Sequence, residues 1–328
     1  MHPQLLLWLQ FLTCSLFIFV AGRKLSLYAD IIAEQTGIGK SWIGILVLAP
    51  LTSLPELFNG VSAVLWVKAP DIAIGGILGS CVCNLFILSL LDFISGDIPL
   101  NQRVKSNHFF SLDFGIIMLA LTGLGMTLNR HIQLGWLSPI SIILFLTYFI
   151  ALYFIYQAEK DITSKTKSTY PYLSLSRAIK RFVLNAVIII IAAIWLPRIG
   201  NALAEVTGLG QTFVGSIFIA LSTSLPELVV TFFAFRLGNA DMAVSNILGS
   251  NIVNLWFIPL YDLLYTQGPL LAFSSPKQLI NIFSSLLMTA TFSLDLTLKP
   301  AKKWHINPLT LFLGIVYSVN LLALYYLR

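Results

Sequence analysis

Long apolar runs alternate with short polar segments along the whole chain, and this alternation predicts its elements. A helix needs about 20 mostly apolar residues to cross the hydrocarbon core of a bilayer. Ten segments meet this requirement, which predicts an all-α polytopic membrane protein. The ten expected spans are residues 4–22, 41–67, 71–94, 108–127, 135–157, 178–197, 211–235, 241–264, 278–298 and 306–327.

The longest polar connection lies near the middle of the chain and separates five spans from five. It covers residues 158–177 and is too short to fold as a domain of its own. We therefore expect a first half over residues 1–157, a linker over 158–177 and a second half over 178–328.

Lysine and arginine are unevenly distributed between alternate connections. If the N-terminus faces outward, the inward connections hold 15 of these residues and the outward side holds 5. Basic residues are enriched in the cytoplasmic loops of membrane proteins. The pattern predicts that both termini face outward and that the central loop is cytoplasmic.

The composition supports a bilayer as the surrounding medium. Of the 328 residues, 57% are apolar and 10% are charged, whereas soluble domains have about 25% charged residues. The net charge of +6 does not indicate nucleic-acid binding, because the basic residues separate apolar runs instead of forming one patch. We expect the lipid bilayer as the partner, a prokaryotic plasma (inner) membrane as the location, and no obligate protein partner.

Two blocks of sequence occur once in each half. Residues 52–57 and 223–228 both read TSLPEL, and residues 71–86 match 241–256 at 8 of 16 positions. The offset is 171 in the first block and 170 in the second. Because each half has an odd number of spans, the second copy enters the membrane from the opposite side. The pattern predicts two inverted five-helix repeats, which in transporters form a binding site near the bilayer midplane.

A glutamate lies about midway along one expected span of each half. Glu56 and Glu227 are costly at this depth unless they pair or contact water, and neither span contains Lys or Arg. A bound cation or a proton is therefore expected to neutralise them. Pro55 and Pro226 precede the glutamates and leave backbone carbonyls without their helical donors.

Hydroxyl and amide side chains accompany the two glutamates. Thr and Ser lie three or four positions before each Glu, and a Ser and an Asn follow four residues apart in the second block. Such an all-oxygen set suits Ca²⁺, Na⁺ or Mg²⁺. Asp92 and Asp262 also match at offset 170, about 12 Å beyond the Asn along a helix. We expect them at helix ends, with an ion vestibule as the alternative.

The two blocks resemble the α-repeats of the calcium:cation antiporter superfamily, specifically its sodium/calcium exchanger branch. The matching stretches are APLTSLPELFNG with GGILGSCVCNL, and ALSTSLPELVV with SNILGSNIVNL. The resemblance implies a cation site formed by side chains of both repeats and by two backbone carbonyls. The implied ligands are Glu56, Glu227, Thr52, Ser53, Thr223, Ser224, Ser80, Ser250, Asn84 and Asn254, with the backbone of Ala49 and Ala220.

The resemblance also implies a mechanism. Na⁺ entering down its gradient would expel Ca²⁺ by alternating access, as spans 1 and 6 slide across the rest. Ca²⁺ and Na⁺ are then cargo, and neither a resident cofactor nor an enzymatic reaction is expected. The first repeat departs from the family pattern, with Pro50-Leu51 before the Thr and with Cys81 where the second repeat has Asn251.

Other functions remain open at this point. A proton-driven or K⁺-dependent cation antiporter would have the same fold, because buried glutamates can also carry protons. A non-transporting, degenerate paralogue is a further alternative. An intramembrane hydrolase is disfavoured, because neither G-x-G-D nor H-E-x-x-H occurs in the chain.

Overall fold

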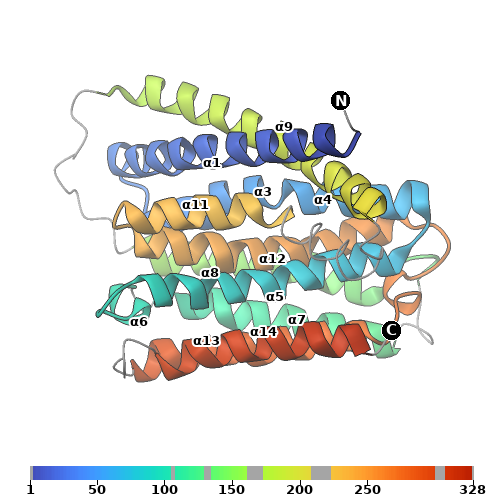
Figure 1. Cartoon of the computed structure of the whole chain (residues 1–328). Coiled ribbons are helices and arrows are strands. Elements are labelled where there is room, and N and C mark those ends of the chain that lie inside the picture. The colour runs from blue at the N-terminus through green and yellow to red at the C-terminus, as the bar shows by residue number, and fades with distance from the viewer. Residues whose placement is uncertain are drawn as a thin grey trace. The chain divides into compact units, whose positions relative to one another are not determined.

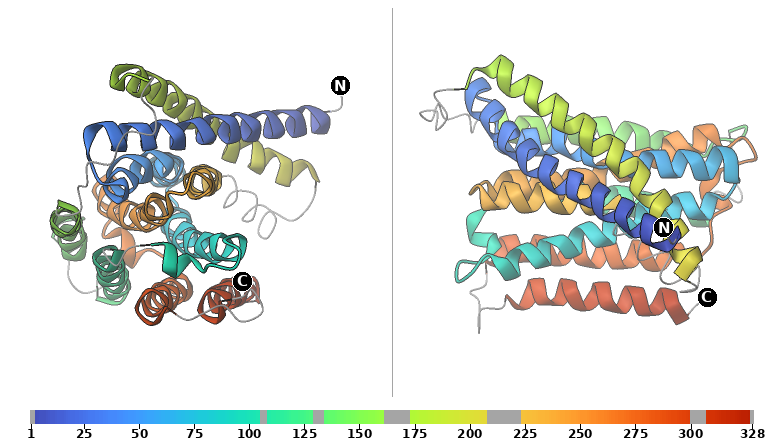
Figure 2. Two further views of the ribbon diagram at one scale, coloured as in Figure 1. Left: turned by 90° about the vertical axis from the view of Figure 1, so that its left-hand side faces the viewer. Right: turned by 45° about the horizontal axis from the view of Figure 1, so that its top comes forward.

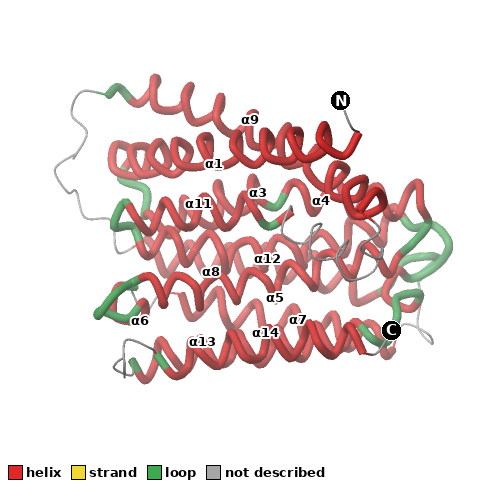
Figure 3. Tube along the Cα trace, viewed as in Figure 1, coloured by secondary structure: helices red, strands yellow, loops and turns green. Residues whose placement is uncertain are grey.

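The computed structural model is almost entirely helical (Figure 3). It describes residues 3–104, 108–128, 134–160, 173–207, 223–299 and 307–326, and none of these forms a strand. The α-helices of these residues, all but α2 labelled in Figure 1, are α1 (Pro3–Thr36), α2 (Lys40–Ile43), α3 (Ala49–Thr52), α4 (Leu54–Ser62), α5 (Pro70–Ile94), α6 (Leu100–Arg103), α7 (Phe109–Leu128), α8 (Pro139–Lys160), α9 (Leu175–Thr207), α11 (Leu225–Arg236), α12 (Ala240–Leu264), α13 (Gln278–Leu298) and α14 (Pro308–Tyr326). The described residues also form the π-helices η1 (Gly44–Leu48) and η2 (Ala63–Val67) and the 3₁₀-helix η5 (Leu270–Ala272).

The expected all-α membrane fold is confirmed. Nine helical stretches in the described part of the chain are long and apolar enough to cross a membrane. They match nine of the ten expected spans. The remaining one, residues 211–235, lies partly outside the described residues, and α11 is the part that the structure describes.

The chain forms two compact units. Unit 1 comprises Met1–Pro55 and Ile162–Asn246, and unit 2 comprises Glu56–Asp161 and Ile247–Arg328. Each unit thus contains segments of both halves of the sequence, and the boundary between the units falls within α4 and α12. The division of the sequence into two repeat halves is a separate description and stays a prediction.

In unit 1, the long helices α1 and α9 lie side by side, and α11 packs against α1 (Figure 2). Gly22 allows α11 to come close, because a Cβ at this position would lie 2.6 Å from Val229 Cγ1. One helical turn further, the Ser26 hydroxyl donates to the Val230 carbonyl over 2.8 Å. Both contacts fix the register of α1 against α11.

Helix α1 extends well beyond the expected span of residues 4–22. Its second half contains polar residues that the apolar run excluded, but the fold buries them with partners. Asp30 is buried and forms an ion pair of 2.6 Å with Lys40 at the start of α2. Lys40 also donates to the Asn239 side chain over 2.6 Å. Tertiary contacts therefore extend the helix where hydrophobicity alone would end it.

In unit 2, α5 packs against α13 and α14, and α7 packs against α8 and α13. Two buried aspartates stabilise the chain after a helix. Asp92, near the end of α5, accepts the Leu100 backbone N–H at 2.6 Å, and Asp262, near the end of α12, accepts the Leu270 N–H at 2.6 Å. The two equivalent aspartates therefore each bind the backbone N–H eight residues further on. Their location at helix ends agrees with the expectation.

The π-helix η2 explains why the offset between the two repeats changes by one residue. The extra residue of the first repeat lies between Leu57 and Asp71. Lys68 (φ 58°) and Gly238 (φ 81°) share the left-handed conformation at offset 170, so the extra residue precedes Lys68. In this interval the first repeat has η2, whereas α11 is a regular α-helix to Arg236. A π-turn holds one residue more than an α-turn, so η2 accommodates the insertion.

Candidate cation site

In both TSLPEL motifs the serine is non-helical and a new helix begins directly after it. Ser53 has φ −83° and ψ 2°, and Ser224 has φ −86° and ψ 2°. Pro55 and Pro226 follow two positions later and occupy the second position of a new helix, where a backbone N–H is not needed. The glutamates therefore lie in the first turn of α4 and α11, and this turn favours a negative charge. The same break in both motifs agrees with a duplication.

Unit 1 contains a group of side chains whose oxygen atoms could coordinate a cation. This group, the unit 1 cluster, contains residues of both TSLPEL motifs. The Ser53 hydroxyl donates to Glu227 Oε1 over 3.2 Å. Glu227 is fully buried, and Thr52, Thr223 and Ser224 are also buried. Among the residues that the structure describes, the Ser224 hydroxyl has no hydrogen-bond partner. A buried polar atom without a hydrogen-bond partner is costly. A cation coordinated by Ser224 Oγ would remove this cost.

Unit 2 contains a second group, the unit 2 cluster. The Ser80 hydroxyl of α5 donates to Glu56 Oε1 over 3.1 Å, and Glu56 is 5% exposed. Asn254 of α12 is fully buried, and neither its amide nitrogen nor its amide oxygen has a hydrogen-bond partner within the described ranges. The Asn84 side-chain oxygen also lacks a partner there. Each unit thus contains a buried carboxylate and at least one buried oxygen to which no described residue donates a hydrogen bond.

The resemblance implies two backbone carbonyls as ligands, and the structure describes the one of Ala49. The Ala49 carbonyl accepts the Ser53 N–H at 3.0 Å and the Thr52 hydroxyl at 3.3 Å. Both of its lone pairs are used, so a cation at this oxygen would replace the longer bond to Thr52. Ala220 lies outside the described residues.

Asn251 is a residue of the unit 2 cluster that sequence reasoning did not include among the ligands. It accepts the Asn84 amide N–H at 3.0 Å and donates to the Cys81 carbonyl over 3.3 Å. Cys81 and Asn251 are equivalent positions of the two repeats, and the Cys81 thiol in turn lies 3.9 Å from the Asn251 carbonyl. Equivalent residues contact each other across a two-fold axis. Cys81, where the first repeat departs from the family pattern, therefore lies at the contact between the two repeats. This departure was the signal in the sequence that pointed to Asn251.

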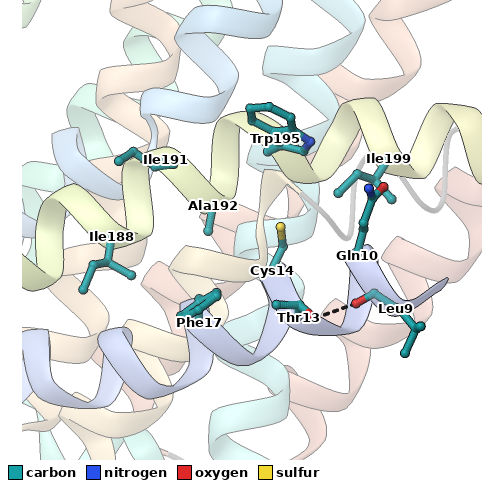
Figure 4. A pocket seen from close by; sticks show the side chains of 10 residues that line it. All are labelled: Leu9, Gln10, Thr13, Cys14, Phe17, Ile188, Ile191, Ala192, Trp195 and Ile199. Carbon is teal, nitrogen blue, oxygen red and sulfur yellow. Dashed lines mark hydrogen bonds between the residues drawn. The ribbon is translucent and has the colours of Figure 1, made fainter. Parts of the chain in front are cut away.

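A hollow of about 560 Å³ lies between α1 and α9 in unit 1 (Figure 4). Its walls are mainly apolar, with Phe17 and Cys14 on one helix and Ile188 and Trp195 on the other. None of the candidate ligands that the structure describes lines it. The hollow is therefore separate from both clusters of oxygen donors.

Comparison with known proteins identifies the family to which these features belong. A family model described as sodium/calcium exchanger protein matches residues 6–157 and 178–327. The sodium/calcium exchanger MaX1 of Methanosarcina acetivorans is 26% identical over 268 residues, which cover 70% of this chain and 75% of the relative. The inner membrane protein YrbG of Escherichia coli is 27% identical over 288 residues, covering 83% of this chain and 85% of the relative.

A solved structure has the same fold. The sodium-calcium exchanger NCX_Mj matches with a TM-score of 0.77 at 20% identity, over 99% of this chain and 100% of that chain. The match to the family model covers both halves of the sequence and includes both TSLPEL motifs. The chain is an integral membrane protein that belongs to the sodium/calcium exchanger family.

Proposed function

We propose that this protein is a secondary active cation antiporter in which Na⁺ entry drives Ca²⁺ export by alternating access. The observation that carries the proposal is that each unit contains a buried carboxylate and buried oxygen atoms without a hydrogen-bond partner in the described part of the chain: Ser224 Oγ in unit 1, and Asn84 Oδ1 and Asn254 Oδ1 in unit 2. An oxygen atom that is buried without a donor is costly, and a bound cation would satisfy it.

The proposed ligands are the twelve residues expected from the sequence. That both clusters serve the same transported ions is inferred from the duplication of the motifs. Glu56 and Glu227 contribute two negative charges, which match one Ca²⁺, and hydroxyl, amide and backbone oxygens complete a hard-ligand set. Ca²⁺ and Na⁺ are substrates in this proposal, and no resident cofactor or covalent chemistry is assigned to the protein.

The proposed orientation follows from the charges of the connections. With both termini outside and the central loop in the cytoplasm, the basic residues lie mainly on the inner side. We assign the protein to the plasma membrane of a prokaryote, in which an inward Na⁺ gradient would supply the driving force.

Flux of ⁴⁵Ca²⁺ in proteoliposomes tests the function. Vesicles loaded with Na⁺ and diluted into Na⁺-free buffer with ⁴⁵Ca²⁺ should accumulate the isotope, whereas vesicles with equal Na⁺ on both sides should not. K⁺ and pH gradients are imposed in separate experiments. Uptake that follows the pH gradient and ignores Na⁺ would replace this proposal by proton-driven exchange, and uptake under none of the gradients would contradict antiport.

The glutamates are tested in the same assay. Glu227→Gln and Glu56→Gln keep the shape of the side chain and an acceptor for Ser53 or Ser80, but remove a charge from the ligand set. Each should reduce Na⁺-driven flux by roughly a hundredfold, since loss of a buried charged partner costs about 3 kcal/mol. Asp113→Asn, at an exposed acid near the start of α7, is the matched control. Normal flux in both glutamine variants would exclude these residues as ligands.

A further inference from the structure

A tyrosine from the second repeat binds the backbone of the first glutamate. Tyr261 of α12 is fully buried, and its hydroxyl donates to the Glu56 carbonyl over 2.8 Å, with the Leu57 carbonyl at 3.4 Å. This hydroxyl therefore contacts α4 at the residue that carries the proposed ligand.

A glycine makes this contact possible. A Cβ at Gly60 would lie 2.1 Å from Cζ and 2.2 Å from the hydroxyl oxygen of Tyr261. No side chain fits at such a distance, so the ring of Tyr261 lies directly on the backbone of α4. The absence of a side chain at Gly60 thus allows close approach of the two helices.

The contact joins two elements of the unit 2 cluster. Asn254 precedes Tyr261 by seven residues, which places both on one face of α12. Helix α4 has only nine residues and lies between the break at Ser53 and the π-helix η2. With an interruption on each side, the first turn of α4 depends on outside contacts for its position.

The second repeat has no equivalent contact. The position equivalent to Tyr261 is Leu91, which cannot donate a hydrogen bond, and the position equivalent to Gly60 is Thr231. Thr231 instead accepts the Asn246 amide N–H at 2.8 Å. The tyrosine contact therefore belongs to the first glutamate alone.

We infer that Tyr261 is a positioning residue that holds Glu56 at the distance from the α12 donors at which a divalent cation binds. This inference rests on the proposed cation transport. Tyr261 does not contact the ion; it fixes the backbone from which the Glu56 carboxylate extends. Its loss should lower the affinity for Ca²⁺ and leave the amount of folded protein unchanged.

Tyr261→Phe tests the inference, because it removes the hydroxyl and keeps the ring on Gly60. We expect the KM for Ca²⁺ in Na⁺-driven flux to rise about fivefold, the effect of one hydrogen bond. The thermal midpoint without Ca²⁺ should stay close to that of the wild type. Tyr265→Phe is the matched control: Tyr265 is also buried, and its hydroxyl bonds the Gln267 side chain at 3.0 Å. It should leave the KM unchanged.

Gly60→Ala provides a second variant, since the added methyl group must displace the ring. It should raise the KM for Ca²⁺ at least as much as Tyr261→Phe. If wild-type vesicles show Na⁺-driven flux and Tyr261→Phe has the same KM, the inference is wrong and the antiport function stands. A fall in maximal rate and thermal midpoint without a change in KM would also overturn it, because that is the result of a purely structural role. Wild-type vesicles without cation-driven flux would contradict both the antiport function and the role of Tyr261.

Discussion

At the scale of single residues, each of the two buried carboxylates accepts a hydrogen bond from a serine, but the two serines belong to different blocks of the repeats. Glu227 accepts a hydrogen bond of 3.2 Å from the hydroxyl of Ser53, which belongs to the TSLPEL motif of the other repeat. Glu56 accepts a hydrogen bond of 3.1 Å from the hydroxyl of Ser80, which belongs to the second block of its own repeat. Hydrogen bonds to an ionised group are stronger than those between neutral groups and orient the acceptor. Each serine thus orients the carboxylate of its glutamate.

Alanine substitution of these serines should therefore give matching effects. Ser53→Ala and Ser80→Ala each remove one hydroxyl that binds a carboxylate and that is also a proposed ligand. The KM for Ca²⁺ should rise roughly tenfold in each variant, because one charge-assisted hydrogen bond contributes about 1.5 kcal/mol.

Ser89→Ala is the control for this pair. Ser89 also lies on α5, but its hydroxyl donates to the Thr310 carbonyl over 2.7 Å. Its KM should equal that of the wild type. Unchanged kinetics in both Ser53→Ala and Ser80→Ala would show that the hydroxyls do not take part in ion binding.

The residue types of the site could be predicted from the sequence, but their pairing could not. Glu, Ser, Thr and Asn in a duplicated pattern indicate oxygen ligands wherever they meet. Which serine contacts which glutamate depends on how distant helices pack. Two further residues could not be identified from the repeat pattern. Asn251 occupies a position where the repeats differ, and Tyr261 lies five residues beyond the matched blocks.

At the scale of elements, the length of the apolar runs predicted where helices occur but not their irregularities. The expected span 41–67 is a single apolar run, yet it contains five helical segments and a break at Ser53. Pro55 predicts the break, because proline removes a helical hydrogen bond. The π-helix η2 has no such signal in its own residues. Only the change of offset between the repeats indicated an extra residue.

Deletion of Leu65 from η2 tests this reading of the element. Removing one residue should convert the π-turn to an α-turn and leave both flanking segments in phase. The thermal midpoint of the purified protein should stay within about 4 °C of the wild type, which corresponds to a change of about 1 kcal/mol.

The comparison is deletion of Phe232 in α11, which has no π-turn to absorb it. That deletion rotates one side of the helix by about 100° relative to the other. It should abolish the monodisperse peak in size-exclusion chromatography. If both deletions have the same effect, η2 does not hold a surplus residue.

At the scale of the whole molecule, the compact units differ from the halves of the sequence. The two halves are visible as repeated motifs, but each unit takes helices from both. A helical repeat buries its apolar and polar faces against whichever helices lie next to it in space. A single sequence records the duplication but not the exchange of neighbours between the copies, so the units could not be predicted.

The predicted orientation is tested by cysteine labelling. In a variant without the native Cys14, Cys81 and Cys83, single cysteines replace Gln102 in the short helix α6 and Lys277 in the turn before α13, both of which are exposed. A membrane-impermeant maleimide applied to intact cells should label Lys277→Cys at once, and Gln102→Cys only after permeabilisation. The reverse result would mean that the termini face the cytoplasm.

The π-helix η2 also bears on the history of the chain. An extra residue that was already present in the ancestral five-helix unit would have been copied into both halves. Because only the first half has the wide turn, the two copies came to differ in length after the gene segment had been duplicated. Among descendants of the same duplication, those in which the two intervals are equal in length should have the same kind of turn in both halves.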